Sequence, residues 1–181
     1  MNALDPLRLP LRGRQVIEAS AGTGKTWTLA ALYLRFVIGH GRPGNTGLSP
    51  RQILVMTFTE AATAELRERI RQRLHDAAVW FEQMLAGKPV DTDSFMEALS
   101  ADLPEEDWPQ CVRRLQLAAH AMDEAAIYTI HGWSRRMLSS FALFSRDVFE
   151  QTHLDHPNAL LQQLVRDHWR HWFYPLPQAL Q

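Results

Sequence analysis

The sequence predicts an α/β fold in which a parallel sheet is flanked by helices. Three short apolar runs, at residues 15–19, 53–58 and 125–129, have the length and composition of strands. Segments with helical spacing follow them at residues 25–38, 60–84 and 131–144. Because helices between successive strands act as crossover connections, this alternation indicates parallel strands, covered on both faces. The carboxyl ends of the strands are then expected to carry the functional site.

Length and composition limit the class of protein. The 181 residues are 46% hydrophobic and 22% charged, as in an ordinary globular chain. The net charge of −1 means that any contact with DNA must come from a local patch. The single cysteine, Cys111, excludes an intramolecular disulfide and is predicted to be a small apolar residue on a helix. No apolar run has the length of a membrane span and residues 1–14 lack a signal-peptide core, so we expect a cytoplasmic protein without a membrane partner.

Residues 19–26, Ala-Ser-Ala-Gly-Thr-Gly-Lys-Thr, match a phosphate-binding loop between the first strand and the first helix. Small residues let the backbone amides approach a phosphate, and the start of the helix favours an anion. Lys25 would contact the β- and γ-phosphates as the catalytic residue, and the Thr26 hydroxyl would ligate Mg²⁺. We therefore expect ATP and Mg²⁺ as cofactors, although Ala19 stands where the general motif has glycine. The predicted ATP-binding residues are Ala19, Ser20, Ala21, Gly22, Thr23, Gly24, Lys25 and Thr26.

The remainder of the chain is predicted to be mostly helical. Beyond a loop at residues 42–50, helices are expected at 94–101, 105–122 and 157–173. Thr59 can cap the helix at 60–84. The buried face of that helix is expected to contain Ala61, Ala64, Leu66, Ile70, Leu74, Ala77 and Ala78. Four arginines alternate along the same segment and are either solvated side chains paired with acids or a phosphate-facing patch; they are Arg67, Arg69, Arg71 and Arg73.

Three separated blocks, at residues 19–26, 57–70 and 129–134, resemble motifs of the UvrD/Rep-like superfamily 1 DNA helicases. Their particular forms, together with residues 4–11 and 168–177, are similar to the β-chain family of exodeoxyribonuclease V, a helicase–nuclease of double-strand-break repair and recombination. The resemblance spans nearly the whole chain. It implies a P-loop NTPase (RecA-like) domain in residues 1–144 and the beginning of a helical subdomain in residues 145–181.

The resemblance also implies binding partners and their contacts. Thr57, Phe58, Thr59 and His131 would lie along a track for single-stranded DNA, where an aromatic ring can stack on a base and polar groups can hold phosphates. The residues alone also permit Phe58 as core, Thr59 as a helix cap and His131 as an ordinary helix residue. Single-stranded or duplex-end DNA and RecC-like and RecD-like subunits are the implied partners. The upstream glutamine with which such helicases read adenine has no counterpart, because Gln15 lies inside the predicted strand.

Hydrolysis of ATP needs an acidic pair after a later strand, and the chain lacks one. The pair Asp123–Glu124 precedes the third strand and is expected to be loop charge at the amino end of the sheet. No carboxylate–lysine cluster of a nuclease is present. We therefore expect the amino-terminal piece of a larger motor that binds nucleotide but alone neither hydrolyses ATP nor unwinds or cuts DNA.

Two other classes of function stay open. One is a different phosphate-loop enzyme, such as a small kinase, and the other is a non-catalytic interaction module with an aromatic tail. That tail consists of Trp169, Trp172, Phe173 and Tyr174. The spacing of His153/His156 and His168/His171 permits a zinc site only if the two segments converge, so surface or interface histidines are expected instead.

Overall fold

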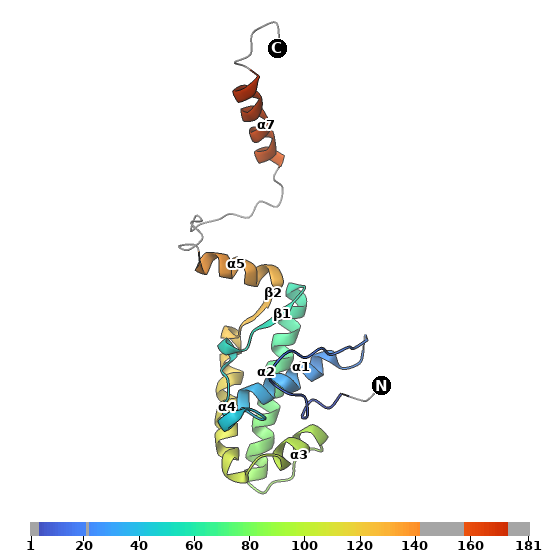
Figure 1. Cartoon of the computed structure of the whole chain (residues 1–181). Coiled ribbons are helices and arrows are strands. Elements are labelled where there is room, and N and C mark those ends of the chain that lie inside the picture. Colours follow the sequence, from blue (N-terminus) through green and yellow to red (C-terminus); the bar gives the residue numbers. More distant parts are fainter. Residues whose placement is uncertain (1–3, 21, 142–157, 174–181) are drawn as a thin grey trace. The chain divides into compact units, whose positions relative to one another are not determined.

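The computed structural model describes residues 4–20, 22–141 and 158–173 (Figure 1). The chain divides into two compact units, Met1–Arg136 and Met137–Gln181. The first unit contains both strands of the described part and every predicted binding residue.

The first unit alternates helices with short strands, in agreement with the predicted α/β class. Its elements are α1 (Lys25–Ile38), β1 (Val55–Thr57), α2 (Glu60–Leu85), α3 (Ser94–Ala101), α4 (Trp108–His120), β2 (Ile127–Thr129) and the start of α5 (Ile130–Ser140). Short 3-10 helices lie at Pro43–Asn45, Pro50–Gln52, Glu105–Asp107 and Ala121–Glu124. The predicted helices at 25–38 and 94–101 have the bounds of α1 and α3. The predicted strands at 53–58 and 125–129 are confirmed in shorter form.

β1 and β2 pair in parallel, as predicted, with Val55 opposite Ile127 and Thr57 opposite Thr129. The face that carries these residues packs on α2. On the other face, the side chains of Leu54 and Met56 remain 45% and 49% exposed. The expectation that both faces of the sheet are covered is therefore wrong for the described residues, because this face is only partly covered, with the Arg136 guanidinium over the Tyr128 ring.

The predicted strand at residues 15–19 is not formed. Residues 14–20 have no regular secondary structure, and Val16 is 79% exposed. A strand needs a neighbour for its N–H and C=O groups, and within the described residues β1 and β2 pair only with each other. An apolar run before a glycine-rich turn was thus not sufficient to form a strand here.

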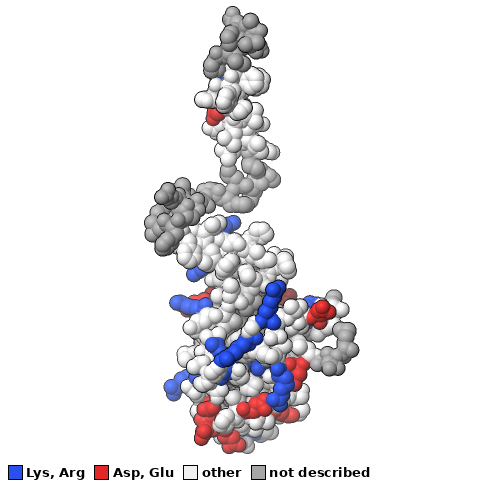
Figure 2. Space-filling view, viewed as in Figure 1, with Lys and Arg blue, Asp and Glu red and all other residues white. Residues whose placement is uncertain are grey.

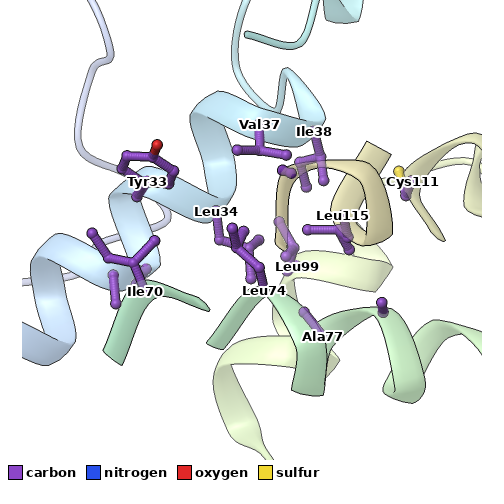
Figure 3. Close-up of a cluster of buried hydrophobic side chains, with 14 of the residues drawn as sticks. Tyr33, Leu34, Val37, Ile38, Ile70, Leu74, Ala77, Leu99, Cys111 and Leu115 are labelled. Atoms are coloured by element: carbon purple, nitrogen blue, oxygen red, sulfur yellow. The ribbon is translucent and has the colours of Figure 1, made fainter. Parts of the chain in front are cut away.

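The core of the first unit lies between α1, α2, α3 and α4 (Figure 3). Each of these helices contributes a fully buried leucine, and these are Leu34, Leu74, Leu99 and Leu115. Cys111 on α4 is also buried, as expected of a small apolar residue, and burial raises the pKa of its thiol to about 11. Gly39 ends α1 with φ of 86°, and a Cβ there would collide with the carbonyl of Asn45.

The buried face of α2 differs from the prediction in its first turns. Leu66, Ile70, Leu74, Ala77 and Ala78 are buried as predicted. Ala61 and Ala64 are exposed, whereas Thr63 is only 4% exposed. The reason is local: the first turns of α2 face the end of β1, where the Thr63 hydroxyl finds hydrogen-bond partners that an alanine could not use.

The second unit contains α7 (Asn158–Trp172), which confirms the predicted helix near residues 157–173. Its apolar side chains are exposed: Leu160, Leu161, Leu164, Val165, Trp169 and Trp172. The predicted continuation of α5 through residues 142–144, together with His153 and His156, lies outside the described residues. In the ranges that the structure describes, no helix is long and apolar enough for a membrane crossing, and no group of three or more His, Cys, Asp or Glu could hold a metal ion.

Candidate nucleotide and nucleic-acid site

The phosphate loop turns sharply into α1. Gly22 and Gly24 have φ of 76° and 82°, a left-handed conformation that favours glycine, and Gly24 is the N-cap residue of α1. The hydroxyl of Thr23 donates to the carbonyl of Ser20 at 2.8 Å, which closes the turn. Ala21 lies outside the described residues. The loop therefore has the bend that the motif predicts, although no strand precedes it.

The side chain of Lys25 reaches back into this bend. Its ammonium Nζ donates to the carbonyls of Ala19 at 3.2 Å and Ser20 at 2.5 Å. These bonds are exposed, so the loop places a solvent-accessible positive charge against its own backbone. An anion that entered the bend would meet that charge directly.

The start of α1 offers further groups to an anion. Gly24 provides no side-chain cap, and the first turn contains no acidic residue. The first N–H groups of a helix have no partners within the helix, and the positive end of the helix dipole lies there. The half-buried Thr26 adds a hydroxyl next to Lys25. These donors fit a triphosphate, and the Thr26 oxygen is the kind of ligand that Mg²⁺ prefers.

The corner between β1 and α2 holds the predicted DNA-contact residues Thr57, Phe58 and Thr59. The Thr59 hydroxyl caps α2 by accepting from the Ala62 N–H at 3.1 Å, as predicted. The Thr57 hydroxyl donates to the Thr59 carbonyl at 3.1 Å and lies 2.5 Å from the Thr63 hydroxyl. Phe58 is 88% exposed, which excludes the core alternative for its ring. The two threonine hydroxyls are thus engaged within the protein, and the ring between them faces solvent.

The corner between β2 and α5 is built around Thr129, which is 6% exposed. Its hydroxyl donates to Oε1 of Glu60 at 3.0 Å and accepts from the Gly132 N–H at 3.0 Å. His131, the fourth predicted DNA-contact residue, is exposed on the first turn of α5. Glu60 thereby joins this corner to the start of α2, a link that the motifs did not reveal because the two residues are far apart in sequence.

The four alternating arginines of α2 all have partners within the chain. Arg67 donates to the Ile127 carbonyl, and the other three pair with carboxylates: Arg69 with Glu65, Arg71 with Asp123 and Arg73 with Asp93. The structure therefore favours paired side chains over a phosphate-facing patch. Figure 2 shows both basic and acidic side chains on the surface in view.

The acidic pair before β2 is engaged in the same way. Asp123 pairs with Arg71 at 2.6 Å, and Glu124 pairs with Arg51 at 2.7 Å. Both residues lie in the 3-10 helix Ala121–Glu124, at the amino end of β2. This placement confirms the prediction of loop charge away from the carboxyl end of the strand.

Sequence reasoning missed a buried polar cluster at the other end of α1. The guanidinium of Arg35, 3% exposed, donates from Nε to Nδ1 of His40 at 2.9 Å and from Nη1 to the carbonyls of Pro6 and Leu9 at 2.6 and 2.8 Å. Burial lowers the pKa of Arg35. Burial and the charge of Arg35 together lower the pKa of His40, and the opposite charge of Asp102 only partly offsets them. The cluster fixes the chain segment that leads into the phosphate loop.

Comparison with known proteins adds the family to this geometry. Residues 3–170 match the UvrD/REP helicase N-terminal domain. The chain belongs to the UvrD/REP helicase family. Within it, the chain is similar to the RecBCD enzyme subunit RecB of Escherichia coli, at 45% identity over 98% of this chain and 15% of that protein. RecB of Haemophilus influenzae is 41% identical over 96% of this chain, and RecB of Chlamydia muridarum is 31% identical over 87%.

These relatives confirm the resemblance inferred from the three motif blocks. The chain spans 14% to 15% of the length of the RecB proteins that it matches. Membership of the UvrD/REP family supports a helicase-type function, and family members in general depend on nucleotide and Mg²⁺. Most of each RecB relative therefore has no counterpart in this chain, and the functions of the whole relatives cannot be assigned to it from the comparison alone.

Proposed function

We propose that residues 19–26 bind ATP with Mg²⁺ and that the chain is the ATP-binding amino-terminal portion of an ATP-dependent DNA helicase–exonuclease subunit in double-strand-break repair and recombination. The observation that carries this proposal is the uncapped start of α1 with the Lys25 ammonium in the adjoining bend. The UvrD/REP match over residues 3–170 supports it. A P-loop NTPase (RecA-like) domain in residues 1–144 and a helical subdomain beginning at residue 145 belong to the same proposal.

Each residue of the loop has a distinct role in this proposal. Lys25 exchanges its bonds to the Ala19 and Ser20 carbonyls for bonds to the β- and γ-phosphates. The Thr26 hydroxyl holds Mg²⁺, which neutralises phosphate charge when bound. The N–H groups of residues 22–26 complete the anion site, because glycine at the N-cap leaves them accessible.

For DNA, we propose that Phe58 stacks on a base and that His131 contacts a phosphate of the same single strand. The 88% exposure of the Phe58 ring, at the end of a strand, supports a binding role rather than a packing role. Thr57 and Thr59 shape this corner with their internally bonded hydroxyls and leave their main chain beside the track. Single-stranded or duplex-end DNA is the proposed nucleic-acid partner.

We further propose that the chain by itself binds nucleotide without turnover. Asp123 and Glu124 are paired with arginines at the amino end of β2, which supports their exclusion from a Mg²⁺-water site. RecC-like and RecD-like subunits are the proposed protein partners, in a cytoplasmic helicase–nuclease complex. Purified chain should show no steady-state ATPase with or without single-stranded DNA. Turnover that disappears in Lys25→Ala would contradict this part.

The lysine content of the chain permits a sharp test of nucleotide binding. Lys25 and Lys88 are the two lysines of the sequence. Equilibrium titration with a fluorescent ATP analogue and Mg²⁺ should show affinity reduced about 10- to 100-fold in Lys25→Ala, since hydrogen bonds to charged groups contribute about 1.5–3 kcal/mol. Lys88→Ala, an exposed position after α2, should bind as the wild type does. Equal affinities in all three proteins would refute the nucleotide site.

α7 favours a second candidate, a non-catalytic interaction module. Its exposed Leu164, Trp169 and Trp172 lie on a helix with an apolar side, which is typical of a docking helix. If that were the main role, Trp169→Ala would abolish association with protein partners, and Lys25→Ala and Phe58→Ala would leave binding of ATP and DNA unchanged. The small-kinase alternative has no support from the family match.

A further inference from the structure

The geometry at the carboxyl ends of the two strands points to Glu60 as a positioning residue. We propose that Glu60, through Thr129, fixes the β1–α2 corner against the start of α5, so that Phe58 and His131 contact one DNA strand together. This inference rests on the proposed DNA-binding function. It concerns how the two contact segments are coupled, which the motifs themselves do not address.

The coupling begins with the register of the sheet. Thr57 and Thr129 are opposite each other and are the last residues of β1 and β2. Each is therefore followed at once by a segment with a proposed DNA contact. In a parallel pair, opposite residues point to the same face, and both hydroxyls indeed bond on the α2 side. The register of the sheet places the ends of β1 and β2 side by side. The hydrogen bonds of the two hydroxyls then orient the segments that follow.

The bonds around Thr129 form a chain with one direction. The Gly132 N–H donates to the Thr129 hydroxyl, and that hydroxyl donates its single proton to Oε1 of Glu60, each at 3.0 Å. The bond to a carboxylate is charge-assisted and hence stronger than a neutral one. Gly132 contributes by having no side chain, since a Cβ there would stand 3.0 Å from the Thr129 hydroxyl oxygen. The start of α5 is thereby connected to the first residue of α2.

The chemistry of Glu60 argues against direct contact with DNA. Its carboxylate is negative and exposed, and it stands two residues after Phe58. A carboxylate beside a phosphate track repels the ligand, so its presence at this position calls for another task. The bond to Thr129 is that task, and the positive start of α2 also favours an acid at this position. Positioning and repulsion predict opposite effects of substitution.

Two matched pairs of variants separate these roles in the purified chain. Glu60→Gln and Thr129→Ser keep an acceptor and a hydroxyl, whereas Glu60→Ala and Thr129→Val remove them. Titration with a fluorescein-labelled oligothymidine should show affinity reduced about fivefold in Glu60→Ala and Thr129→Val, in the range of coupling between residues of one network. The affinities of Glu60→Gln and Thr129→Ser for the oligothymidine should lie within twofold of the wild-type affinity. Thermal unfolding by circular dichroism verifies that each variant is folded, and exposed Glu60 provides a test even if Thr129→Val does not fold.

A double-mutant cycle between Phe58→Ala and His131→Ala measures the coupling between the two contacts, which would not change if Glu60 had only a structural role. We expect the two losses of affinity to be non-additive in the Glu60→Gln background and additive in the Glu60→Ala background. Exchange of the Gly132 amide, followed by NMR, should accelerate in Thr129→Val and Glu60→Ala and stay unchanged in Glu60→Gln.

The outcomes distinguish failure of the inference from failure of the proposed function. If Phe58→Ala and His131→Ala weaken binding but Glu60→Ala does not, the positioning role is refuted and the DNA site stands. Tighter binding by both Glu60→Ala and Glu60→Gln would show Glu60 to be a repulsive charge only. Unchanged binding by Phe58→Ala and His131→Ala would refute the DNA site, and the inference with it.

Discussion

The starts of α1 and α2 show two opposite treatments of the same chemical problem. Every helix begins with N–H groups that lack partners within the helix. At α1 the N-cap is Gly24, no side chain accepts from these groups, and Lys25 brings a positive charge. At α2 Thr59 caps the helix and the acid Glu60 occupies the first turn. The first start is open to an anion from solution, and the second is completed by the protein itself.

The start of α3 follows the pattern of α2. The Asp93 carboxylate accepts from the N–H groups of Phe95 and Met96 and pairs with Arg73 at 2.6 Å. Burial raises the pKa of Asp93, but these hydrogen bonds and the charge of Arg73 outweigh it, so that the pKa lies below its ordinary value. Among these three helices, an open start thus occurs only where the phosphate-loop motif stands. The difference supports the proposed binding site at α1 and a structural role for the starts of α2 and α3.

The largest effect should come from giving α1 the acid that it lacks. Gly24→Asp places a carboxylate in the anion site, and like charges about 4 Å apart repel by about 4 kcal/mol at an effective dielectric constant of 20. Affinity for the fluorescent ATP analogue with Mg²⁺ should fall by about 100-fold or more. The decisive control is Gly24→Asn, which has the same shape and also tolerates a left-handed φ. If both variants bound equally poorly, backbone strain rather than charge would explain the loss, and the open-start interpretation would lose its support.

A smaller effect, on stability alone, should follow from opening the start of α2. Thr59→Ala removes the acceptor for the Ala62 N–H and should lower the free energy of unfolding by about 1 kcal/mol. Thr59→Ser keeps a hydroxyl and should cost less. Urea denaturation measures the change, and the affinity for the ATP analogue should be the same in all three proteins. A loss of nucleotide binding in Thr59→Ala would break the division between binding and framework.

The smallest effect should appear at the carboxyl end of α1, where burial and the charge of Arg35 disfavour protonation of His40. The folded-state pKa of His40 is lowered, chiefly by burial and then by Arg35, whereas the unfolded chain titrates near pH 6.5. As the pH falls through about 6.5, the unfolded state therefore takes up a proton that the native state refuses. The contribution of His40 to the free energy of unfolding is therefore fully present above about pH 6.5, and it is lost as the pH falls towards the lower pKa of the native state.

Urea titrations between pH 7.5 and pH 5.5 should show this decline in wild type. His40→Asn supplies a neutral acceptor for the Arg35 Nε–H and should flatten the dependence. Identical slopes in the two proteins would place the titrating group elsewhere. Asp102 and Arg8 are the other charged groups near His40.

Local signals in the sequence were sufficient for much of this fold. α1 could be predicted with its bounds because glycines mark both ends, and Thr59 could be predicted as a cap because its hydroxyl stands directly before a helical segment. β1 and β2 were evident as short apolar runs, and their parallel pairing followed from the helices between them. The bend at Lys25 was implied by the motif. In all these cases the deciding groups are neighbours in sequence.

The features that could not be predicted depend on groups distant in sequence. The run at residues 15–19 has strand composition, but strand formation requires a neighbouring strand, which composition does not reveal. Thr63 is buried because the end of β1 supplies oxygens for its hydroxyl, and Glu60 is bonded to a residue on β2. Arg35 has the appearance of an ordinary helix arginine until its contacts with Pro6 and Leu9 are known.

The hydrogen bonds from Arg35 to Pro6 and Leu9 would affect the entropy lost when the phosphate loop binds a nucleotide. Pro6 and Leu9 are held by its guanidinium, and Lys25 is held by α1, so the chain between them is a tether with both ends fastened. A fastened segment samples fewer conformations than a free tail and therefore loses less entropy when it closes around a ligand. Lysine cannot replace this arginine, because a compact ammonium does not present the planar fork that reaches three separate acceptors. If the bend at Lys25 binds a nucleotide as proposed, Arg35, near the other end of α1, would thus lower the entropy cost of that binding.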